Sequence, residues 1–426
     1  MLDKKIGSKP KGELVYVGPE FSSQLKSHHL AWKYNIYALQ PQSSQTIYVD
    51  ANSGNVILKL DLQMDTDYYR GTGAGRYSGN VEFSTHRFEE GFKLGGITGK
   101  FDTEVVTWNM NNAPYPSDEI ITEFVDGDNL WNLNNPSHDE VAIDIQWGLE
   151  QSINYYADKF NRNSVDDNGM TIIGLAHLGN RYSNASWTGG WAQFGDGSNN
   201  NPFTSLGIVG HELTHAVTQF SAGLIYQGES GALNEAFSDM FGIAIEFNVG
   251  KDTPEDIWQL GNEIYQYGSM RSMSNPNDFN QPDTYGGMNW ANPDDMATDN
   301  GGVHINSGIA NFWFYLLTEG GEDVNDNGEN YSVTGIGIEK AEKIAYKTLT
   351  EYLTPSSQFI EARIASLLAT EDLYGIGSEE YIQVSNAWHA VGVGGPYSKK
   401  QINLVSYEGP TAQCGNLRGI VRFKST

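Results

Sequence analysis

Basic residues and cysteines are scarce in this chain. Lys and Arg number 26 against 53 Asp and Glu, so the formal net charge of the 426 residues is −27. Such a surface repels phosphate groups, which excludes nucleic acid and anionic membranes as expected partners. The single cysteine, Cys414, can form no internal disulfide bond and can contribute no ligand to the metal site considered below.

Long apolar runs are also missing. The longest strongly apolar run, residues 309–317, is too short to cross a bilayer, so we expect no membrane span. No apolar stretch follows the first five residues, so the sequence opens without a recognisable export signal. A hydrophobic content of 39% with 12% aromatic residues is still ample for the packed cores of two or three domains.

Residues 211–215 read His-Glu-Leu-Thr-His. On a helix, His211 and His215 lie one turn apart on the same face, so both imidazoles can reach one metal ion. Zinc favours nitrogen and oxygen ligands in tetrahedral geometry, and catalytic zinc sites leave one position to water. Glu212 would lie beside that water and accept its proton. The pentapeptide also arises by chance, so its interpretation depends on the residues that follow.

A second acidic motif follows 20 positions after His215, with Glu235 and Asp239 four residues apart. Both lie in an apolar segment, residues 232–247, which predicts a second helix antiparallel to the first. Glu235 would be the third zinc ligand, and Asp239 would accept the free N–H of a ligand imidazole. The alternative for Asp239 is a solvated carboxylate on the helix surface, which its large apolar neighbours disfavour.

These motifs resemble the thermolysin-like family of neutral zinc metalloendopeptidases. The resemblance covers about residues 66–396 and includes VGHELTHAVTQFSAGLIYQGESGALNEAFSDMFG, DNGGVHINSGIANFWFYLL at 299–317, and YLTPSSQFIEARIASLLATEDLYG. The metzincin class is excluded, because Thr218 and Ser221 stand where it needs a glycine and a third histidine. We therefore expect an α+β fold, with a β-rich half, a helical half and the zinc helix at their junction, where the cleft should lie.

The resemblance implies two further groups that stabilise the charge of the transition state. His304 corresponds to the family's histidine at the tetrahedral intermediate, and Asp299 to the carboxylate that orients it. Tyr226 matches a second donor to the oxyanion. A donor aimed at charge that appears only in the transition state would accelerate the reaction. Without the zinc motif, His304 would read as a surface histidine in a glycine-rich turn and Tyr226 as a loop aromatic.

Substrate contacts also follow from the resemblance. Asn184 and Ala185 resemble the edge segment that pairs with a peptide backbone, although Ser186 replaces the family's aromatic residue. Arg271 matches the arginine that holds a substrate carbonyl. An apolar pocket would favour cleavage before bulky hydrophobic residues. Its expected lining could equally be plain core and consists of Ile208, Leu260 and Met270.

Calcium sites are expected to be fewer than is usual in the family. The family's double calcium site retains only Glu246, because Gly207 replaces an aspartate and residues 257, 259 and 262 are no longer acidic. Asp126 and Asp128 retain another candidate calcium site, although an Asx turn explains them almost as well. The acidic residues 323–328 lack the glutamate of an EF-hand loop and are interpreted as a surface turn.

Four segments are expected along the chain. Residues 1–65 look like the last part of a PepSY-type propeptide, with a strand at 30–39 and a hairpin near residue 54; an ordinary small β-domain is the alternative. Residues 66–220 form the β-rich half, whose first long helix begins at a capping box, Ser137 to Glu140, and continues to about Phe160. Residues 221–395 are helical, including 338–352 and 358–373. Residues 396–426 are a tail or the start of a truncated β-domain.

The sequence as a whole predicts a secreted zinc endopeptidase made as a zymogen. Protein or peptide substrates and its own propeptide would be the partners, with propeptide cleavage near residues 61–72, where Met64-Asp-Thr-Asp is a plausible site. Secretion would mean that the export signal is missing from this sequence. The alternatives are a protease-like binding module with little turnover, and a zinc exopeptidase, which would need a charged subsite for a peptide terminus.

Overall fold

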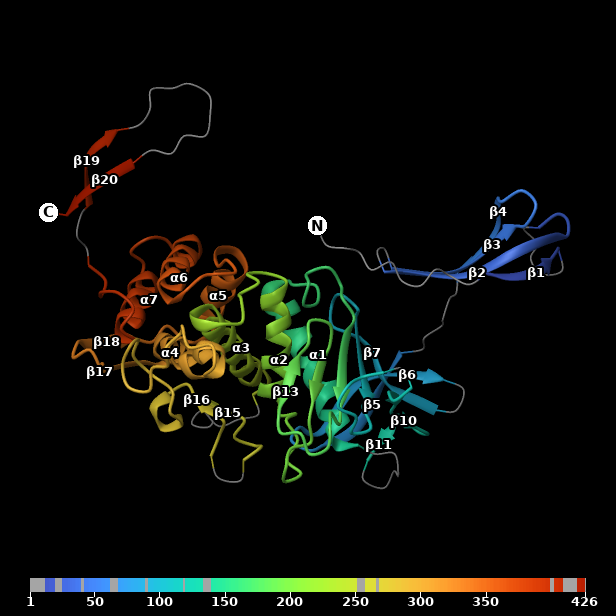
Figure 1. Cartoon of the computed structure of the whole chain (residues 1–426), viewed down its shortest axis with the longest axis horizontal. Helices are drawn as coiled ribbons and strands as arrows, with labels where there is room; N and C mark the ends of the chain where they lie inside the picture. Colours follow the sequence, from blue (N-terminus) through green and yellow to red (C-terminus); the bar gives the residue numbers. More distant parts are fainter. Residues whose placement is uncertain are drawn as a thin grey trace. The chain divides into compact units, whose positions relative to one another are not determined.

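The structure of the chain is a computed structural model that describes residues 12–19, 25–39, 42–61, 68–88, 91–117, 119–132, 139–250, 257–265, 268–398, 402–408 and 420–425. The chain divides into two compact units, Met1–Asp67 and Tyr68–Thr426 (Figure 1). Among the described residues, no helix is long and apolar enough to cross a membrane.

The first unit contains one antiparallel sheet in the order β1-β2-β3-β4. Its strands are β1 (Glu13–Val17), β2 (His29–Leu39), β3 (Gln42–Asp50) and β4 (Val56–Asp61). The expected hairpin is confirmed: β3 and β4 pair, and the carboxylate of Asp50 accepts hydrogen bonds from the backbone of Asn52 and Ser53 in the turn. The assignment of this unit to a propeptide stays a prediction, and the proposed cleavage region at residues 64–67 lies outside the described residues.

The second unit begins with a ten-stranded mixed sheet. Its main path runs β11-β5-β6-β7-β8-β12-β14-β13, with β10 beside β7 and β9 beside β8. The strands are β5 (Tyr68–Gly75), β6 (Gly79–Phe88), β7 (Gly91–Thr98), β8 (Thr103–Asn109), β9 (Thr122–Glu123), β10 (Val125–Asp126), β11 (Leu130–Trp131), β12 (Ile172–Ala176), β13 (Ala185–Trp187) and β14 (Ala192–Phe194). β13 is therefore an edge strand.

The second unit also contains the long helices of the chain. They are α1 (Glu140–Phe160), α2 (Leu206–Gln219), α3 (Gly228–Val249), α4 (Asp299–Glu319), α5 (Ile338–Lys347), α6 (Phe359–Tyr374) and α7 (Glu379–Ala390), with a short 3-10 helix η1 (Pro276–Phe279) and a π-helical turn η2 (Thr348–Tyr352). Two-stranded pairs are formed by β15 (Gln259–Leu260) with β16 (Arg271–Ser272), β17 (Gly320–Val324) with β18 (Asn330–Thr334), and β19 (Ile402–Glu408) with β20 (Ile420–Ser425).

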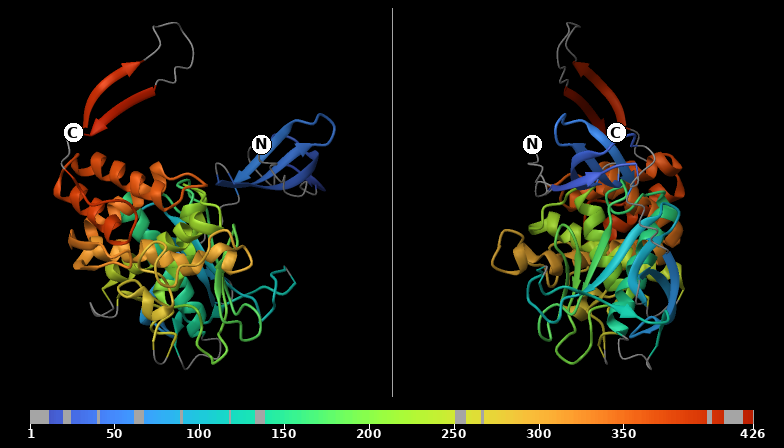
Figure 2. Two further views of the ribbon diagram at one scale, coloured as in Figure 1. Left: turned by 60° about the vertical axis from the view of Figure 1, so that its left-hand side comes forward. Right: turned by 90° about the vertical axis from the view of Figure 1, so that its right-hand side faces the viewer.

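The elements of the second unit pack in successive layers. Helix α1 lies against the sheet, α2 packs on α1, α3 on α2, and α4 on α3. Figure 1 shows this order from the strands to the helices, and the left-hand view of Figure 2 shows the orange and red helices on the other side of the unit from the cyan strands. One hydrophobic core runs through all these layers, and α1, which lies between the sheet and α2, is buried along most of its length. The predicted α+β fold is confirmed.

The start of α1 differs from the prediction. Asp139 is the N-cap, and its Oδ1 accepts hydrogen bonds from the N–H groups of Val141 and Ala142, each at 3.0 Å. Because Asp139 is the N-cap, the prediction that Ser137 caps this helix is wrong; Ser137 itself lies outside the described residues. Asp139 does what the predicted cap would have done, because it accepts hydrogen bonds from otherwise unpaired N–H groups in the first turn, but the helix begins two residues later than predicted.

Other predicted elements are present with shifted ends. Helix α3 begins four residues before the predicted start at 232, and the helix predicted at 338–352 ends as a π-helical turn. Helix α6 matches residues 358–373 within one residue, with Gln358 as its cap. The acidic residues 323–328 lie in the β17–β18 hairpin, which confirms a turn in place of an EF-hand.

Candidate active site

The helix that carries the His-Glu-Leu-Thr-His motif packs unusually close to its neighbour α3. A Cβ atom on Gly242 would lie 2.6 Å from the carbonyl oxygen of Gly207, and one on Gly210 would lie 2.9 Å from Cδ1 of Ile245. Glycine at these positions therefore lets the backbones of α2 and α3 approach. The close crossing brings Glu235 of α3 beside the two histidines of α2.

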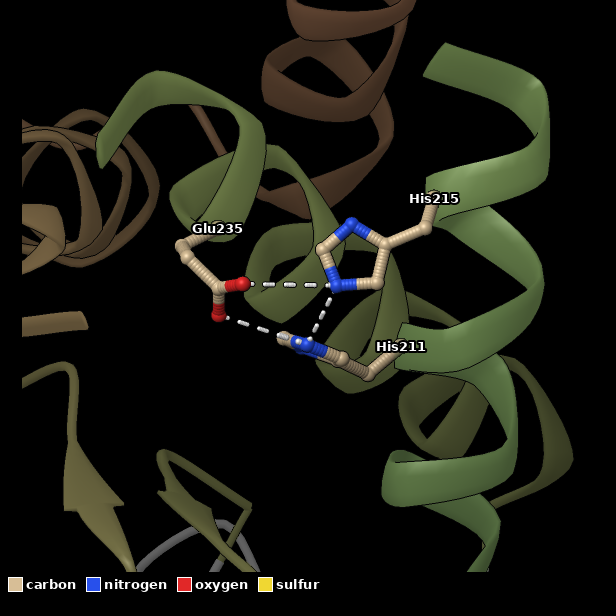
Figure 3. A group of neighbouring side chains, drawn as sticks. All are labelled: His211, His215 and Glu235. Atoms are coloured by element: carbon tan, nitrogen blue, oxygen red, sulfur yellow. Dashed lines mark hydrogen bonds and ion pairs between the residues drawn. The ribbon is translucent and has the colours of Figure 1, made fainter. Parts of the chain in front are cut away.

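Three side chains meet at this crossing. Nε2 of His211 and Nε2 of His215 lie 3.0 Å apart, and the carboxylate oxygens of Glu235 lie 3.5 Å and 3.4 Å from them. Figure 3 shows both imidazoles projecting from α2 towards the carboxylate on α3. All three ligand atoms lie within 4.8 Å of one another. Glu235 is 1% exposed, and its Oε2 has no hydrogen-bond partner. Two imidazoles and a buried, unpartnered carboxylate oxygen are a donor set that fits zinc.

The outer nitrogens of both imidazoles are held by polar side chains. Nδ1 of His211 lies 2.8 Å from Asp239, and Nδ1 of His215 lies 2.8 Å from Oδ1 of Asn234. These contacts turn the Nε2 atoms towards Glu235. Asp239 lies where the sequence predicted it. The role of Asn234 in holding the His215 ring was not predicted, although Asn234 directly precedes Glu235 in the motif.

Asp239 is fully buried among cations and donors. Arg271 donates two hydrogen bonds to its carboxylate, at 2.8 and 2.7 Å, and Nδ2 of Asn311 donates a third at 2.8 Å. Burial alone would raise the pKa of Asp239, but Arg271 and His211 outweigh it and hold the pKa far below its usual range. Asp239 therefore stays charged, as a buried carboxylate does when it is paired in this way. Arg271 was predicted to contact substrate. In the structure its guanidinium group is hydrogen-bonded to Asp239, and the substrate contact stays a prediction.

Tyr226 and His304 lie beside Glu235, one of the three metal-ligand candidates. The hydroxyl of Tyr226 donates to Glu235 and lies 3.0 Å from Nε2 of His304. Burial and the Glu235 carboxylate raise the pKa of Tyr226, so its hydroxyl keeps its proton. Nδ1 of His304 lies 2.6 Å from Asp299, which leaves Nε2 facing the site. The structure thus brings together all three residues that the sequence assigned to this part of the site.

A cleft of about 690 Å³ opens over these groups. Glu212, at 6% exposure, lies in its floor beside the histidines. Residues from Asn184 to Gly189, which include the edge strand β13, form one rim. The predicted residues Asn184, Ala185, Arg271, Ile208 and Met270 all line the cleft.

One predicted pocket residue does not reach the cleft. Leu260 is completely buried in the core, and the short β15–β16 pair places it directly opposite Arg271. Its prediction as a lining residue is therefore wrong. Phe203 and Leu224 line the cleft instead and were not predicted. No periodic signal marks either residue, because each lies outside the helices and strands.

Glu246, the residue retained from the family's double calcium site, is hydrogen-bonded to the start of the zinc helix. The carboxylate of Glu246 accepts a hydrogen bond of 2.7 Å from the N–H of Gly207, in the first turn of α2. Asp144 and Glu263 line the same small pocket as Glu246. The loss of the family's double calcium site therefore stays a prediction from the sequence.

Two imidazoles, a carboxylate and a neighbouring glutamate at the floor of an open cleft define the class of zinc-dependent peptidases. Comparison with known proteins agrees. Residues 70–219 match the thermolysin metallopeptidase catalytic domain, and residues 222–393 match the thermolysin metallopeptidase alpha-helical domain. The chain belongs to the thermolysin family and is a zinc metalloendopeptidase.

Relatives extend over most of the chain. A bacillolysin from Brevibacillus brevis is 35% identical over 404 residues, which cover 92% of this chain and 70% of the relative. A thermolysin from Alicyclobacillus acidocaldarius subsp. acidocaldarius is 42% identical over 383 residues, covering 85% and 66%. A solved structure, the precursor of the metalloproteinase protealysin from Serratia proteamaculans, has a TM-score of 0.57 and 29% identity, covering 70% of this chain and 90% of its own.

Proposed function

We propose that this enzyme cleaves internal peptide bonds of proteins on the N-terminal side of bulky hydrophobic residues, with Glu212 as general base. The observation that carries the proposal is the position of Glu212. It is buried in the cleft floor, next to His211 on the helix that offers two of the three zinc ligands. Zinc held by His211, His215 and Glu235 would supply a Lewis acid for water and for the substrate carbonyl. Glu212 accepts the proton of the attacking water and passes it to the leaving amine.

Tyr226 and His304 are proposed to stabilise the charge that develops on the carbonyl oxygen. Support comes from the 3.0 Å separation of the Tyr226 hydroxyl and Nε2 of His304, which places two polar groups on one side of the cleft. Asp299 holds the ring of His304 through Nδ1. Donors fixed before the reaction cost no reorganisation when charge appears on the oxygen.

The substrate is proposed to lie along β13 in an extended conformation. An edge strand has unpaired backbone groups that can pair with an added strand. We propose that the substrate backbone pairs with this edge at Asn184 and Ala185. Apolar side chains on the cleft wall support the preference for a bulky hydrophobic residue after the scissile bond. They are Phe203, Ile208, Leu224 and Met270. Arg271 lines the cleft and is held there by its hydrogen bonds to Asp239. It is the proposed contact to a substrate carbonyl.

The first unit, Met1–Asp67, is proposed to be part of a propeptide that inhibits a secreted enzyme until it is removed. Two observations support this. The unit is compact and separate from the catalytic unit, and the solved protealysin structure that resembles this chain is that of a precursor. Secretion and zymogen synthesis belong to the same proposal.

A single calcium site at Asp126 and Asp128 is also proposed. Asp126 is 1% exposed, and its Oδ2 has no hydrogen-bond partner. Burial raises the pKa of Asp126, and the neighbouring Asp128 charge raises it further. A cation at this position would relieve both costs.

The central experiment compares the chain with Glu212→Gln, which keeps the size of the side chain and removes the base. Both proteins are loaded with zinc, and metal content is measured before an assay on casein and on a peptide blocked at both termini. We expect equal zinc content and a loss of at least about 10²-fold in turnover for the variant.

The blocked peptide and its products separate the alternatives. A zinc exopeptidase would cut casein fragments with free ends and leave the blocked peptide intact. A binding module would hold zinc, and processed wild type and variant would be equally inert. Mass spectrometry of the new N-terminal residues tests the preference for bulky hydrophobic side chains, which equal cleavage before alanine and phenylalanine would refute.

A further inference from the structure

Gln219 is the last residue of α2, one turn beyond His215, and its amide contacts the rim of the cleft. Its Oε1 accepts a hydrogen bond of 2.8 Å from Nε1 of Trp187, at the end of the edge strand β13. Its Nε2 donates one of 3.3 Å to the carbonyl oxygen of Gly189. One amide therefore ties both the strand end and the following turn to the helix that carries the histidines.

The two partners fix the orientation of the amide. An indole N–H can only donate and a backbone carbonyl can only accept, so one side chain must offer an acceptor and a donor together. A glutamate at position 219 could accept from Trp187 but could not donate to Gly189. An asparagine would be shorter by one methylene group.

The segment held by Gln219 is a hairpin with a tight turn. β13 and β14 pair antiparallel, and the N–H of Thr188 donates to the carbonyl oxygen of Trp191 at 3.0 Å to close the turn. Gly189 has a φ of 94°, a conformation that other residues rarely adopt. Beyond β14 the hairpin joins the sheet, while its β13 edge faces the cleft. The tip of this edge is where Gln219 binds.

We propose that Gln219 is a positioning residue that holds β13 at the height above the zinc site needed for an extended substrate to pair with it. This rests on the proposed function, because it assumes a peptide lying along β13. Only peptides long enough to reach Trp187 and Gly189 depend on the position of that tip. Short substrates contact the floor of the cleft, where the geometry is set by α2 and α3. Gln219 therefore determines how much the enzyme gains from substrate length.

The test compares Gln219→Leu, which loses both hydrogen bonds, with Gln219→Glu, which loses only the donor to Gly189. Each is assayed on a doubly blocked dipeptide and on a blocked octapeptide with the same scissile bond. For the octapeptide we expect Gln219→Leu to lower kcat/KM about two- to tenfold, mainly through KM, and Gln219→Glu to lower it less. Turnover of the dipeptide and zinc content should stay unchanged in both variants.

A double variant, Gln219→Leu with Trp187→Phe, tests whether the two residues act through one contact. The loss should be smaller than the sum of the single losses. Equal losses on both peptides, or strictly additive losses, would overturn the positioning role.

A measurement without turnover keeps this proposal separate from the proposed function. In the Glu212→Gln background, binding of the octapeptide and hydrogen exchange of residues 185–191 are compared with and without Gln219→Leu. Weaker binding and faster exchange are expected. Unchanged binding and exchange would refute the role of Gln219 even in an active protease, whereas a wild type that leaves both peptides intact would refute the proposed function alone.

Discussion

The stability of the catalytic unit should fall with rising pH because of His177. This residue follows β12, and its ring lies between two carboxylates: Nε2 is 2.8 Å from Asp139, the N-cap of α1, and Nδ1 is 2.8 Å from Asp196. Carboxylates only accept hydrogen bonds, so both ring nitrogens must donate and the ring carries a positive charge. Burial alone would lower the pKa of His177, but Asp139 and Asp196 outweigh it and raise the pKa to about 10.

The sign and size of the effect follow from linkage. Below pH 6.5, the ordinary pKa of histidine, the ring is protonated in both the folded and the unfolded chain, and the bridge contributes fully. Between pH 6.5 and 10 the unfolded chain loses this proton first, so the free energy of unfolding declines. The pKa of His177 differs by 3.5 between the folded and the unfolded chain, 10 minus 6.5, so the bridge can contribute at most about 5 kcal/mol to the free energy of unfolding. Side-chain exposures of 16%, 24% and 23% for the three residues reduce this to about 2–4 kcal/mol.

The assay is urea unfolding at pH 6, 7, 8 and 9, followed by tryptophan fluorescence in the inactive Glu212→Gln background with excess zinc. The comparison variant is His177→Asn, because the φ of 59° at this position is one that asparagine tolerates. The variant should be about 2–4 kcal/mol less stable at pH 6, and the gap should narrow towards pH 9. Stability curves that run parallel across this range would refute the charged bridge, since effects of pH on zinc binding are common to both proteins.

Three further perturbations follow from the site and the core. Asp239→Asn should weaken zinc affinity about 10- to 100-fold in a competition assay with a chelator, and unchanged affinity would contradict its control of His211. Trp313→Ala should cost about 3–5 kcal/mol of stability in urea titration, because the ring is 1% exposed and stacked on Trp388 at 4.8 Å. Gly231→Ala should reduce kcat with little change in zinc content, since its Cβ would lie 2.4 Å from Val303 and would push α3 from α4; wild-type kcat would exclude this.

Local sequence patterns were sufficient to predict which metal-site residues share a face where a single helix sets the geometry. His211 and His215 share a face because they are four residues apart, and Glu235 and Asp239 repeat that spacing on the next helix. The family resemblance added His304, Asp299 and Tyr226, whose neighbourhood no spacing could reveal. These assignments of fold and metal site depended on short-range periodicity and on motif order.

Tertiary contacts account for what the sequence did not reveal. The bond from Asn234 to His215 depends on how α3 is rotated against α2, which periodicity leaves open. Leu260 was misassigned because the two-residue strand β15 is too short to show which face is inward. The pairing of Asp239 with Arg271 joins residues 32 positions apart through the core.

The first turn of α4 has a consequence for how this enzyme can change. Four successive residues, 299–302, have φ values between 51° and 84°, so the chain winds left-handed before the regular helix begins. Oδ2 of Asp299 then accepts hydrogen bonds from the N–H groups of His304 and Ile305, at 2.8 and 3.2 Å, while Oδ1 holds the His304 ring through Nδ1. The signal that begins the helix and the restraint that aims the imidazole are thus the same side chain. Insertions, deletions or recombination breakpoints between positions 299 and 304 would remove both together, so this hexapeptide can be exchanged between related proteases only as an intact unit.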